Sequence, residues 1–341
     1  MYQAKFYKKL NNNLVQCTLC SHYCSIKDNE VGICHVRENK AGTLYSLVYG
    51  HPVAQNIDPI EKKPLFHFLP GSLTYSIGTL GCNFTCANCQ NWDISQAKPL
   101  SGLKRHLVAE AFLEPKKIIQ EAIGNNCKSI SYTYNEPTIF TEYALDIMKL
   151  AHENNLKNVW VSNGFMTDVC LKAILPYLDA INIDLKSIEN DFYKNNCSAR
   201  LKPTLENLKK IKQEQVHLEI TTLIIPSLSD DFEMLKKIAD FIVSELDTET
   251  PWHISRFSRD ISWKLKKLTS TREDIIYSAY DIGKQAGLKY VYTGNMSGDS
   301  KENTYCSKCN ELAIRRMGYH IERLDNKGRC ASCDKGLDIV E

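Results

Sequence analysis

The residues best placed to do chemistry are three cysteines, Cys82, Cys86 and Cys89, which are separated by three and two residues. They follow the apolar, strand-like residues 73–80, so one tight loop holds all three thiols. This spacing lets a loop wrap its thiolates around a [4Fe–4S] cluster. Three ligands leave one iron open, whereas a structural metal site normally closes its coordination. The loop therefore predicts an open iron where a substrate or cofactor binds. The competing interpretations are a zinc loop completed by a distant cysteine and three buried thiols without a metal.

The loop resembles the CxxxCxxC signature of radical S-adenosylmethionine (SAM) enzymes. The resemblance implies that SAM binds the open iron through its amino and carboxylate groups. It also implies that the reduced cluster cleaves SAM to a 5′-deoxyadenosyl radical, so that the cofactor carries the difficult chemistry. The cofactors expected on this basis are a [4Fe–4S] cluster and SAM.

A second group of cysteines lies near the N-terminus, in a short polar segment. It consists of Cys17, Cys20, Cys24 and Cys34. Four thiolates can close around Zn²⁺ or around an Fe–S cluster, and the spacing does not distinguish the two. Because the segment has little apolar core of its own, we expect the metal to help fold it. The site is either an auxiliary electron-transfer cluster or a zinc staple.

A third group lies near the C-terminus and forms two CxxC pairs, Cys306 with Cys309 and Cys330 with Cys333, separated by twenty residues. Paired CxxC motifs at this distance predict a four-cysteine ribbon. Zinc is favoured over iron because the ligand set is closed and tetrahedral. The remaining cysteines, Cys127, Cys170 and Cys197, stand alone in the sequence, and each is predicted to be a packed or exposed bystander.

Polar residues follow the predicted strands, and in a barrel of parallel strands functional groups gather at the carboxyl ends. Pro137 can begin a helix, which would leave Asn135 and Glu136 exposed at the rim. Glu136 stands where related enzymes bind the SAM amino group, and its carboxylate could accept hydrogen bonds from that ammonium. The family's usual double glycine is missing here. The alternative is that Glu136 caps the helix.

Two further strand ends carry polar residues suited to SAM. Asn163 could bond the ribose hydroxyls, although a simple strand-to-helix turn competes with this interpretation. In residues 181–186, the strand pattern places Asp184 and Lys186 on one face, where a buried pair needs polar partners. This run resembles the Asp-Leu-Lys element beside SAM in glycyl-radical-enzyme activases. The alternative is a self-satisfied ion pair between the two side chains. His253 and Arg256 are weaker candidates for substrate contact, and His67 is predicted to be a packed histidine.

The elements that must position these residues alternate between strand-like and helix-like segments, which predicts a parallel sheet. Seven runs have the pattern of buried strands: residues 73–80, 129–133, 159–162, 181–185, 218–225, 252–256 and 290–293. Six of them could form the partial (β/α)6 barrel of radical SAM proteins. The predicted organisation is α/β: an N-terminal extension over residues 1–70, the barrel over 71–296, and a ribbon over 297–341 that begins with a linker at 297–300.

Composition narrows the function classes. The 341 residues carry a net charge of +2, and their basic residues are dispersed, so neither nucleic acid nor a membrane is an expected partner. The N-terminus lacks the apolar core of a signal peptide, and no apolar run is long enough to span a bilayer. Fourteen cysteines in such a chain argue for metal ligation over disulfides. We therefore expect a cytoplasmic protein.

Further motifs narrow the resemblance. They are residues 58–64, 81–84, 89–91, 134–137 and 302–306, together with both outer cysteine groups. The chain resembles the radical SAM protein of the AmmeMemoRadiSam system, which is close to pyruvate formate-lyase activating enzymes. This implies AMMECR1-like and Memo-like partners and an electron donor such as flavodoxin or ferredoxin. It does not imply a substrate, for which a partner protein is one candidate. Asn88 departs from the aromatic residue that many such loops place against adenine. A non-catalytic, metal-rich module that binds protein or RNA is the alternative.

Overall fold

The computed structural model describes residues 1–97, 112–296 and 298–341. Its centre is one eight-stranded sheet with the order β14-β13-β12-β11-β10-β9-β8-β7. The strands are β7 (Ala54–Pro59), β8 (Leu73–Gly78), β9 (Ser129–Tyr132), β10 (Lys157–Ser162), β11 (Ala180–Asp184), β12 (His217–Ile224), β13 (Trp252–Arg256) and β14 (Val291–Gly294). Strands β8 to β14 run parallel, and β7 is antiparallel to β8 at one edge. The predicted α/β fold with a parallel sheet is confirmed, and the sheet uses all seven predicted strands where six were expected.

The edge strand β7 was not predicted as a strand. Ala54 pairs with Gly78 and Pro59 pairs with Leu73, so β7 and β8 form a hairpin within the central sheet. The predicted boundary at residue 70 cuts through this hairpin. Between the two strands, Ile60–Lys62 forms a 3-10 turn.

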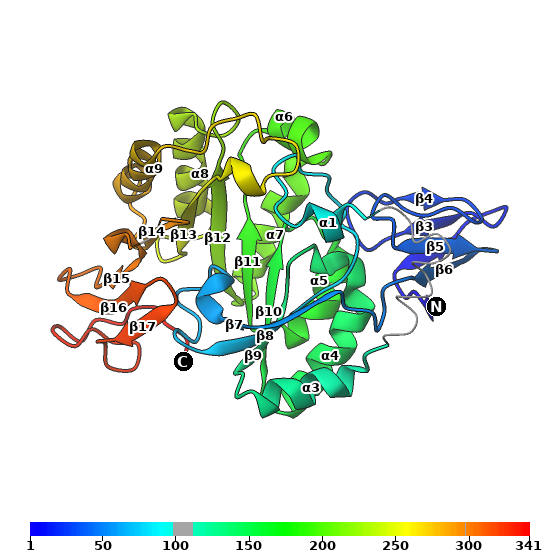
Figure 1. Cartoon of the computed structure of the whole chain (residues 1–341), viewed down its shortest axis with the longest axis horizontal. Coiled ribbons are helices and arrows are strands. Elements are labelled where there is room, and N and C mark those ends of the chain that lie inside the picture. Colours follow the sequence, from blue (N-terminus) through cyan, green and yellow to red (C-terminus); the bar gives the residue numbers. More distant parts are fainter. Residues whose placement is uncertain (98–111, 297) are drawn as a thin grey trace.

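Helices alternate with the parallel strands and lie around the sheet (Figure 1). They are α1 (Trp92–Ser95), α3 (Pro115–Gly124), α4 (Thr141–Glu153), α5 (Asp168–Ile174), α6 (Asn190–Phe192), α7 (Leu201–Gln213), α8 (Phe232–Glu245) and α9 (Glu273–Gln285). Each long helix buries one apolar face; α4, for example, buries Tyr143, Ile147 and Met148. Asp231 caps α8 by accepting a hydrogen bond from the Met234 amide at 2.8 Å. No helix in the described ranges combines the length and apolarity needed to cross a membrane.

Two cysteine-bearing regions flank the sheet on opposite sides (Figure 1). The N-terminal region holds two small sheets, made of β1 (Tyr2–Gln3), β5 (Arg37–Lys40) and β6 (Thr43–Ser46), and of β2 (Tyr7–Lys9), β3 (Val15–Cys17) and β4 (Ser25–Ile26). The C-terminal ribbon holds β15 (Thr304–Tyr305), β16 (Leu312–Met317) and β17 (His320–Arg323). The first residue of the predicted linker, Ser297, lies outside the described residues.

Candidate active site

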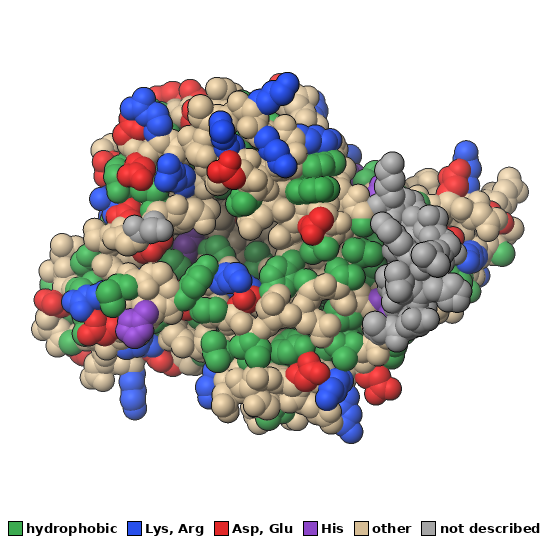
Figure 2. Space-filling view, viewed as in Figure 1, with side chains coloured by type: hydrophobic (Ala, Val, Ile, Leu, Met, Phe, Trp, Pro, Cys, Tyr) green, Lys and Arg blue, Asp and Glu red, His purple; other side chains and the backbone are tan. Residues whose placement is uncertain are grey.

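A cavity of about 600 Å³ opens at the carboxyl ends of the parallel strands. Figure 2 shows the surface hollowed in the middle of the face, between the upper helices and the ribbon. The three loop cysteines Cys82, Cys86 and Cys89 line the cavity, and so do Glu136, Asn163, Asp184 and Lys186. The structure therefore brings together every residue that the sequence suggested for the cluster loop and for SAM.

The cysteine loop is held in place by its neighbours. Asn135 donates from Nδ2 to the Gly81 carbonyl oxygen at 2.7 Å and accepts the Thr79 amide at 3.2 Å. Gly81 has φ +89, and a Cβ there would lie 2.5 Å from the Cys34 carbonyl oxygen, so this position requires glycine. Phe84 packs edge-on against Phe165, with ring centroids 5.2 Å apart. The loop is thus fixed at both ends by the barrel and by the N-terminal region.

The environment of the three thiols suits an iron–sulfur cluster. The Phe84 amide donates to Cys82 Sγ at 3.4 Å, and Ser95 Oγ lies 3.2 Å from Cys89 Sγ. Burial raises the pKa of the Cys82 and Cys89 thiols, so a bound cation is needed to hold them as thiolates. In the described parts of the chain, only the C-terminal cysteines bring three or more metal-ligand atoms within 4.8 Å of one another. The loop thiols are spread more widely, as a cluster requires and a zinc ion does not.

Cys197 lies beside the loop, although the sequence presented it as a bystander. It is buried and shares a hydrogen bond with Cys86. The π-helical residues Tyr193–Cys197 dock on the loop through backbone bonds, with the Thr85 amide donating to the Cys197 carbonyl oxygen at 3.1 Å. The two cysteines are far apart in sequence, so no spacing signal could have revealed this contact.

Glu136 was expected at the exposed rim, but it is only 2% exposed. Its Oε1 accepts hydrogen bonds from the Thr138 amide, from Thr138 Oγ1 and from Ser162 Oγ, at 3.0, 2.5 and 2.8 Å. Its Oε2 accepts the Asn163 amide at 2.8 Å. Burial raises the pKa of this carboxyl group above its ordinary value. The side chain does cap a turn, as the alternative interpretation held, and it also ties the end of β9 to the end of β10.

Asn163 connects the end of β10 to the cysteine loop. Its Nδ2 donates to Asn83 Oδ1 at 2.7 Å, and its Oδ1 accepts the Phe165 amide at 3.0 Å. Asn83 directly follows Cys82, so this side chain supports the loop as well as lining the cavity. The predicted strand-to-helix turn is present too, because Thr167 caps α5 through the Cys170 amide at 3.2 Å.

Asp184 and Lys186 form the ion pair that the alternative interpretation described, with Nζ 2.7 Å from Oδ2. The pair faces the cavity, so the ion pair does not exclude contact with a ligand. Burial acts to lower the pKa of Lys186, but Asp184 and the neighbouring thiols Cys86 and Cys197 raise it well above its ordinary value. Lys186 therefore carries its positive charge next to the cluster loop throughout the physiological pH range.

A buried lysine in the cavity wall was missed. Lys62 and Lys63 resemble a solvated basic pair in sequence, yet Lys63 is 2% exposed and pairs with Asp58 at 2.6 Å. Asp58 also accepts hydrogen bonds from Lys62 Nζ at 2.8 Å and from the Tyr134 hydroxyl at 2.7 Å. Burial lowers the pKa of Lys63 to about 8. The cavity thus has positive charge on two walls, from Lys63 and Lys186.

The weaker histidine and arginine candidates have structural partners. His253 lines a neighbouring cavity of about 360 Å³, and its Nε2 lies 2.6 Å from the buried Glu219 carboxylate. Arg256 donates from Nε to the Thr271 carbonyl oxygen at 2.7 Å and lines neither this cavity nor the cluster cavity. Thr271 is itself held in place, because its Oγ1 donates to the Ile224 carbonyl oxygen at 2.6 Å. His67 is fully buried, as predicted, and burial lowers its pKa to about 3.

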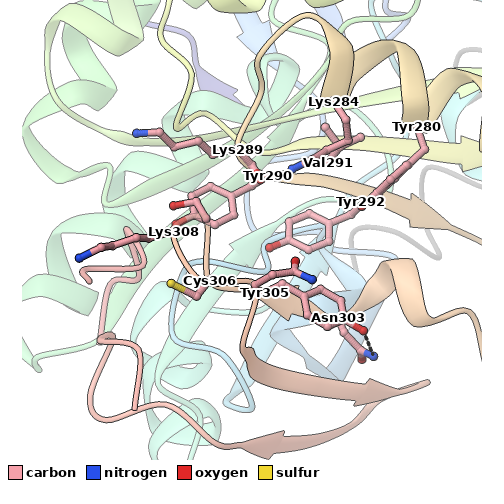
Figure 3. A pocket seen from close by; sticks show the side chains of 12 residues that line it. Tyr280, Lys284, Lys289, Tyr290, Val291, Tyr292, Asn303, Tyr305, Cys306 and Lys308 are labelled. Atoms are coloured by element: carbon pink, nitrogen blue, oxygen red, sulfur yellow. Dashed lines mark hydrogen bonds between the residues drawn. The ribbon is translucent and has the colours of Figure 1, made fainter. Parts of the chain in front are cut away.

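The C-terminal cysteines have the geometry of a zinc site. Cys306 Sγ lies 3.6 Å from Cys333 Sγ, and Cys309 Sγ lies 3.5 Å from Cys330 Sγ. Tetrahedral ligands at about 2.3 Å from Zn²⁺ would be separated by similar distances. Cys306 also borders a cavity of about 180 Å³ between β14 and the ribbon. Figure 3 shows the rings of Tyr290, Tyr292 and Tyr305 in its wall. None of the three loop cysteines borders this cavity, so it is separate from the cluster site.

Comparisons with known proteins agree with this geometry. Residues 76–242 match the model of the Radical SAM superfamily. The chain is 43% identical over 343 residues to an uncharacterized protein of Methanocaldococcus jannaschii, covering 100% of both chains. It is 23% identical over 199 residues to the pyruvate formate-lyase-activating enzyme of Clostridium pasteurianum, covering 55% of this chain and 80% of that one.

A solved structure shares the fold. The complex of Streptococcus suis SuiB with its precursor peptide SuiA matches with a TM-score of 0.51 at 13% identity. The match covers 70% of this chain and 52% of SuiB, so the chain spans about half of that protein's length. The cysteine loop, the parallel sheet and the sequence match together show that this chain is an enzyme of the radical SAM superfamily and is homologous to pyruvate formate-lyase activating enzymes.

Proposed function

We propose that the protein cleaves SAM reductively and uses the product radical to take a hydrogen atom from a substrate in the cavity at the strand ends. The observation that carries this proposal is the placement of Cys82, Cys86 and Cys89 in the wall of a cavity of about 600 Å³. When bound there, a [4Fe–4S] cluster supplies the electron that splits SAM into methionine and a 5′-deoxyadenosyl radical.

The chain's own residues bind and orient SAM in this proposal. Lys186 places a permanent positive charge beside the loop, which suits the SAM carboxylate. Asp184 faces the same cavity and can accept hydrogen bonds from ribose hydroxyls. Glu136 already accepts four hydrogen bonds from its own chain, so its role is to hold the ends of β9 and β10 in register. We assign binding to the Asp184–Lys186 pair and positioning to Glu136 and Asn163.

The test is SAM cleavage by anaerobically reconstituted protein. With dithionite and SAM, we expect 5′-deoxyadenosine from the natural chain and none from Cys86→Ala. Cys127→Ala is the matched control, because Cys127 is buried away from the cavity and does not line it. An intact cluster at the loop, shown spectroscopically, without SAM cleavage would overturn the proposal. Zinc at all three cysteine groups, without a brown chromophore, would favour a non-catalytic module that binds protein or RNA.

The substrate is a partner protein or a metabolite, and we propose a partner protein on the strength of the homology to activating enzymes. We further propose that the protein belongs to the AmmeMemoRadiSam system, with AMMECR1-like and Memo-like partners, and that it works in the cytoplasm with a flavodoxin or ferredoxin as donor. Anaerobic co-purification with the products of neighbouring genes, followed by mass spectrometry, tests this. A modified glycine or other residue in a partner is expected. A modified small molecule with unmodified partners would contradict the protein substrate.

A further inference from the structure

The cavity of about 360 Å³ next to the cluster cavity shares part of its wall. The residues that line both cavities are Lys62, Pro64, Ser255, Asn295 and Tyr319. Asp184 and Lys186 line the cluster cavity and not this second one. A molecule bound across the shared wall would therefore extend from the second cavity toward the pair that we assign to SAM.

The C-terminal ribbon supplies part of the wall of the second cavity. Gly318 and Tyr319 line it from the turn between β16 and β17, and Glu302 lines it from the 3-10 turn that leads into β15. Glu61 and Phe66 reach the same cavity from the connection between β7 and β8. The ribbon therefore borders a cavity beside the cluster site, in addition to carrying its own cysteine site.

Two carboxylates in this cavity have acceptor capacity that the fold does not use. Glu61 is 5% exposed; its Oε1 accepts the Gly71 amide at 2.7 Å, whereas its Oε2 has no hydrogen-bond partner among the described residues. Glu302 is half-buried, and burial together with the nearby Asp299 raises its pKa to about 7. Burial also raises the pKa of Glu61. Buried acceptors normally have partners, so these two groups fit a ligand that donates hydrogen bonds.

The cations near these carboxylates give their hydrogen bonds to other groups. Lys62 pairs with Asp58 at 2.8 Å. The charge of Arg316 acts to lower the pKa of both carboxyl groups. However, its Nη1 donates to the Glu302 carbonyl oxygen at 3.0 Å and its Nη2 to the Phe66 carbonyl oxygen at 2.8 Å. A positively charged donor on a ligand would therefore find both carboxylates available.

The rest of the wall suits an alkyl chain. Pro64, Phe66 and Met296 line the cavity, and Phe66 and Met296 are 9% and 5% exposed. Lysine and arginine side chains combine an apolar stem with a charged end, and they bury the stem against apolar surface. Apolar walls together with two carboxylates match this combination.

We propose that the second cavity binds a lysine or arginine side chain of the substrate protein, whose charged end contacts Glu61 and Glu302. The neighbouring part of the substrate then lies in the cluster cavity. That the ligand belongs to a substrate rests on the proposed function, whereas the site for an alkyl ammonium or guanidinium group does not. Through Glu302 and Tyr319, the ribbon takes part in selecting the substrate.

Methionine-methyl NMR of the anaerobically reconstituted holoenzyme tests the site. Met296 lines the second cavity and not the cluster cavity, and Met148, buried in α4, is the internal control. The probes are Nα-acetyl-lysine amide, Nα-acetyl-arginine amide and the uncharged Nα-acetyl-norleucine amide. At least one cationic probe is expected to shift Met296 alone and to bind about tenfold more tightly than the norleucine probe. No shift with either cation, or affinities equal to that of the norleucine probe, would overturn the proposal.

Carboxylate variants test which residues hold the cation. Glu61→Gln and Glu302→Gln each remove one charge and keep the side-chain shape, so each should weaken the cationic probe about tenfold. The glutamine at position 61 retains an acceptor for the Gly71 amide. Glu311→Gln is the matched control, because Glu311 is an exposed ribbon carboxylate that does not line the cavity. An unchanged affinity in either variant would overturn the role assigned to that residue.

Two further comparisons define the ligand. SAM added without a reductant is expected to leave the affinity of the cationic probe unchanged, and competition would overturn a site separate from that of SAM. Tighter binding of free n-pentylamine than of the lysine probe would overturn a protein side chain as the ligand. Probe binding by a holoenzyme that does not cleave SAM would refute the proposed function and leave the cation site standing. SAM cleavage without probe binding would refute the cation site alone.

Discussion

The N-terminal and C-terminal four-cysteine sites flank the central sheet on opposite sides, and they are built into the molecule in different ways (Figure 1). The ribbon has a small core of its own, formed by Cys306, Ala313, Cys330 and Leu337. Two of those four residues are metal-ligand candidates. The N-terminal region instead sends Val15, Leu19, Ile26 and Val36 into the main core of the protein.

This difference predicts that folding depends on the metal to different degrees at the two four-cysteine sites. A region whose core consists largely of ligands needs its metal to fold. A region that shares the main core is held by apolar packing, so it should stay folded when its metal is removed. The expectation that the metal folds the N-terminal segment for lack of apolar core therefore overlooked its contact with the barrel. The three predictions that follow test this contrast, starting with the largest expected effect.

Removing one ribbon thiol should have the largest effect. Cys330→Ser is expected to lower the zinc content from about one atom per chain to none and to unfold residues 304–323, because a structural zinc site contributes about 10 kcal/mol or more to the folding of such a small unit. Hydrogen exchange and metal analysis measure both. Cys34→Ser is the matched variant: it should lose the metal of the N-terminal site but keep protected amides in β5 and β6. Equal unfolding of both regions would break the contrast.

Breaking the buried ion pair behind the N-terminal site should have an intermediate effect. Arg37→Met leaves the Glu142 carboxylate buried without its cation, and the expected loss is about 3–5 kcal/mol in the free energy of unfolding. The double variant Arg37→Met/Glu142→Leu should recover most of that loss in urea denaturation. Lys202→Met, which removes the exposed pair with Glu206, is the control. A loss as small as that of the control would show that the N-terminal region is not anchored through the core.

The smallest expected effect is a pH-dependent change in thermal stability. Of the two sites compared, we expect it at Glu302 in the ribbon and not at Glu142. Burial and the nearby Asp299 raise the pKa of Glu302 to about 7. The folded state then holds a proton that the unfolded state releases, so this contribution to stability is complete below about pH 4.5 and is lost as the pH rises through 7. As the pH rises from 5 to 8, the Tm of the natural chain should therefore fall relative to the Tm of Glu302→Gln.

The buried ion pair that joins Arg37 of the N-terminal region to Glu142 of α4 supplies the control for that experiment. Burial acts to raise the pKa of Glu142, but the Arg37 guanidinium holds it below its ordinary value. Glu142 thus stays ionised over the same pH range, and the Tm difference between the natural chain and Glu142→Gln should be constant. If the Tm difference changed with pH as steeply for Glu142→Gln as for Glu302→Gln, the two sites would not differ in the way predicted.

Much of the fold could be predicted because its strands are buried on both faces and therefore read as continuous apolar runs. All seven parallel strands were found in this way. The edge strand β7 was not, because its sequence Ala-Gln-Asn-Ile-Asp-Pro lacks both an apolar run and a regular alternation. It is a strand because β8 offers it a free edge, which is a property of the assembled sheet.

The site residues could be predicted by type and by strand position, whereas their roles depended on contacts between distant segments. Glu136 was expected to be exposed because Pro137 suggested a helix start, but Ser162 and Asn163 on the next strand supply donors that make burial favourable. The contact of Cys197 with Cys86 follows from the docking of a π-helical turn. Lys63 is buried because Asp58 supplies a countercharge. The contacts of Glu136 and Cys197 join segments far apart in the sequence and have no local signature, whereas Asp58 and Lys63 are only five residues apart.

The enclosure of the Glu136 carboxylate has a consequence for the energetics of binding. Four donors, two from Thr138 in the 3-10 turn Pro137–Phe140 and two from Ser162 and Asn163 at the end of β10, converge on one buried group. This edge of the cavity is therefore stiff before any ligand arrives. A ligand that enters the cavity then has little backbone freedom to remove there, and more of its contact energy remains as affinity. The backbone entropy of this part of the cavity wall is lost when the chain folds, and not when the ligand binds.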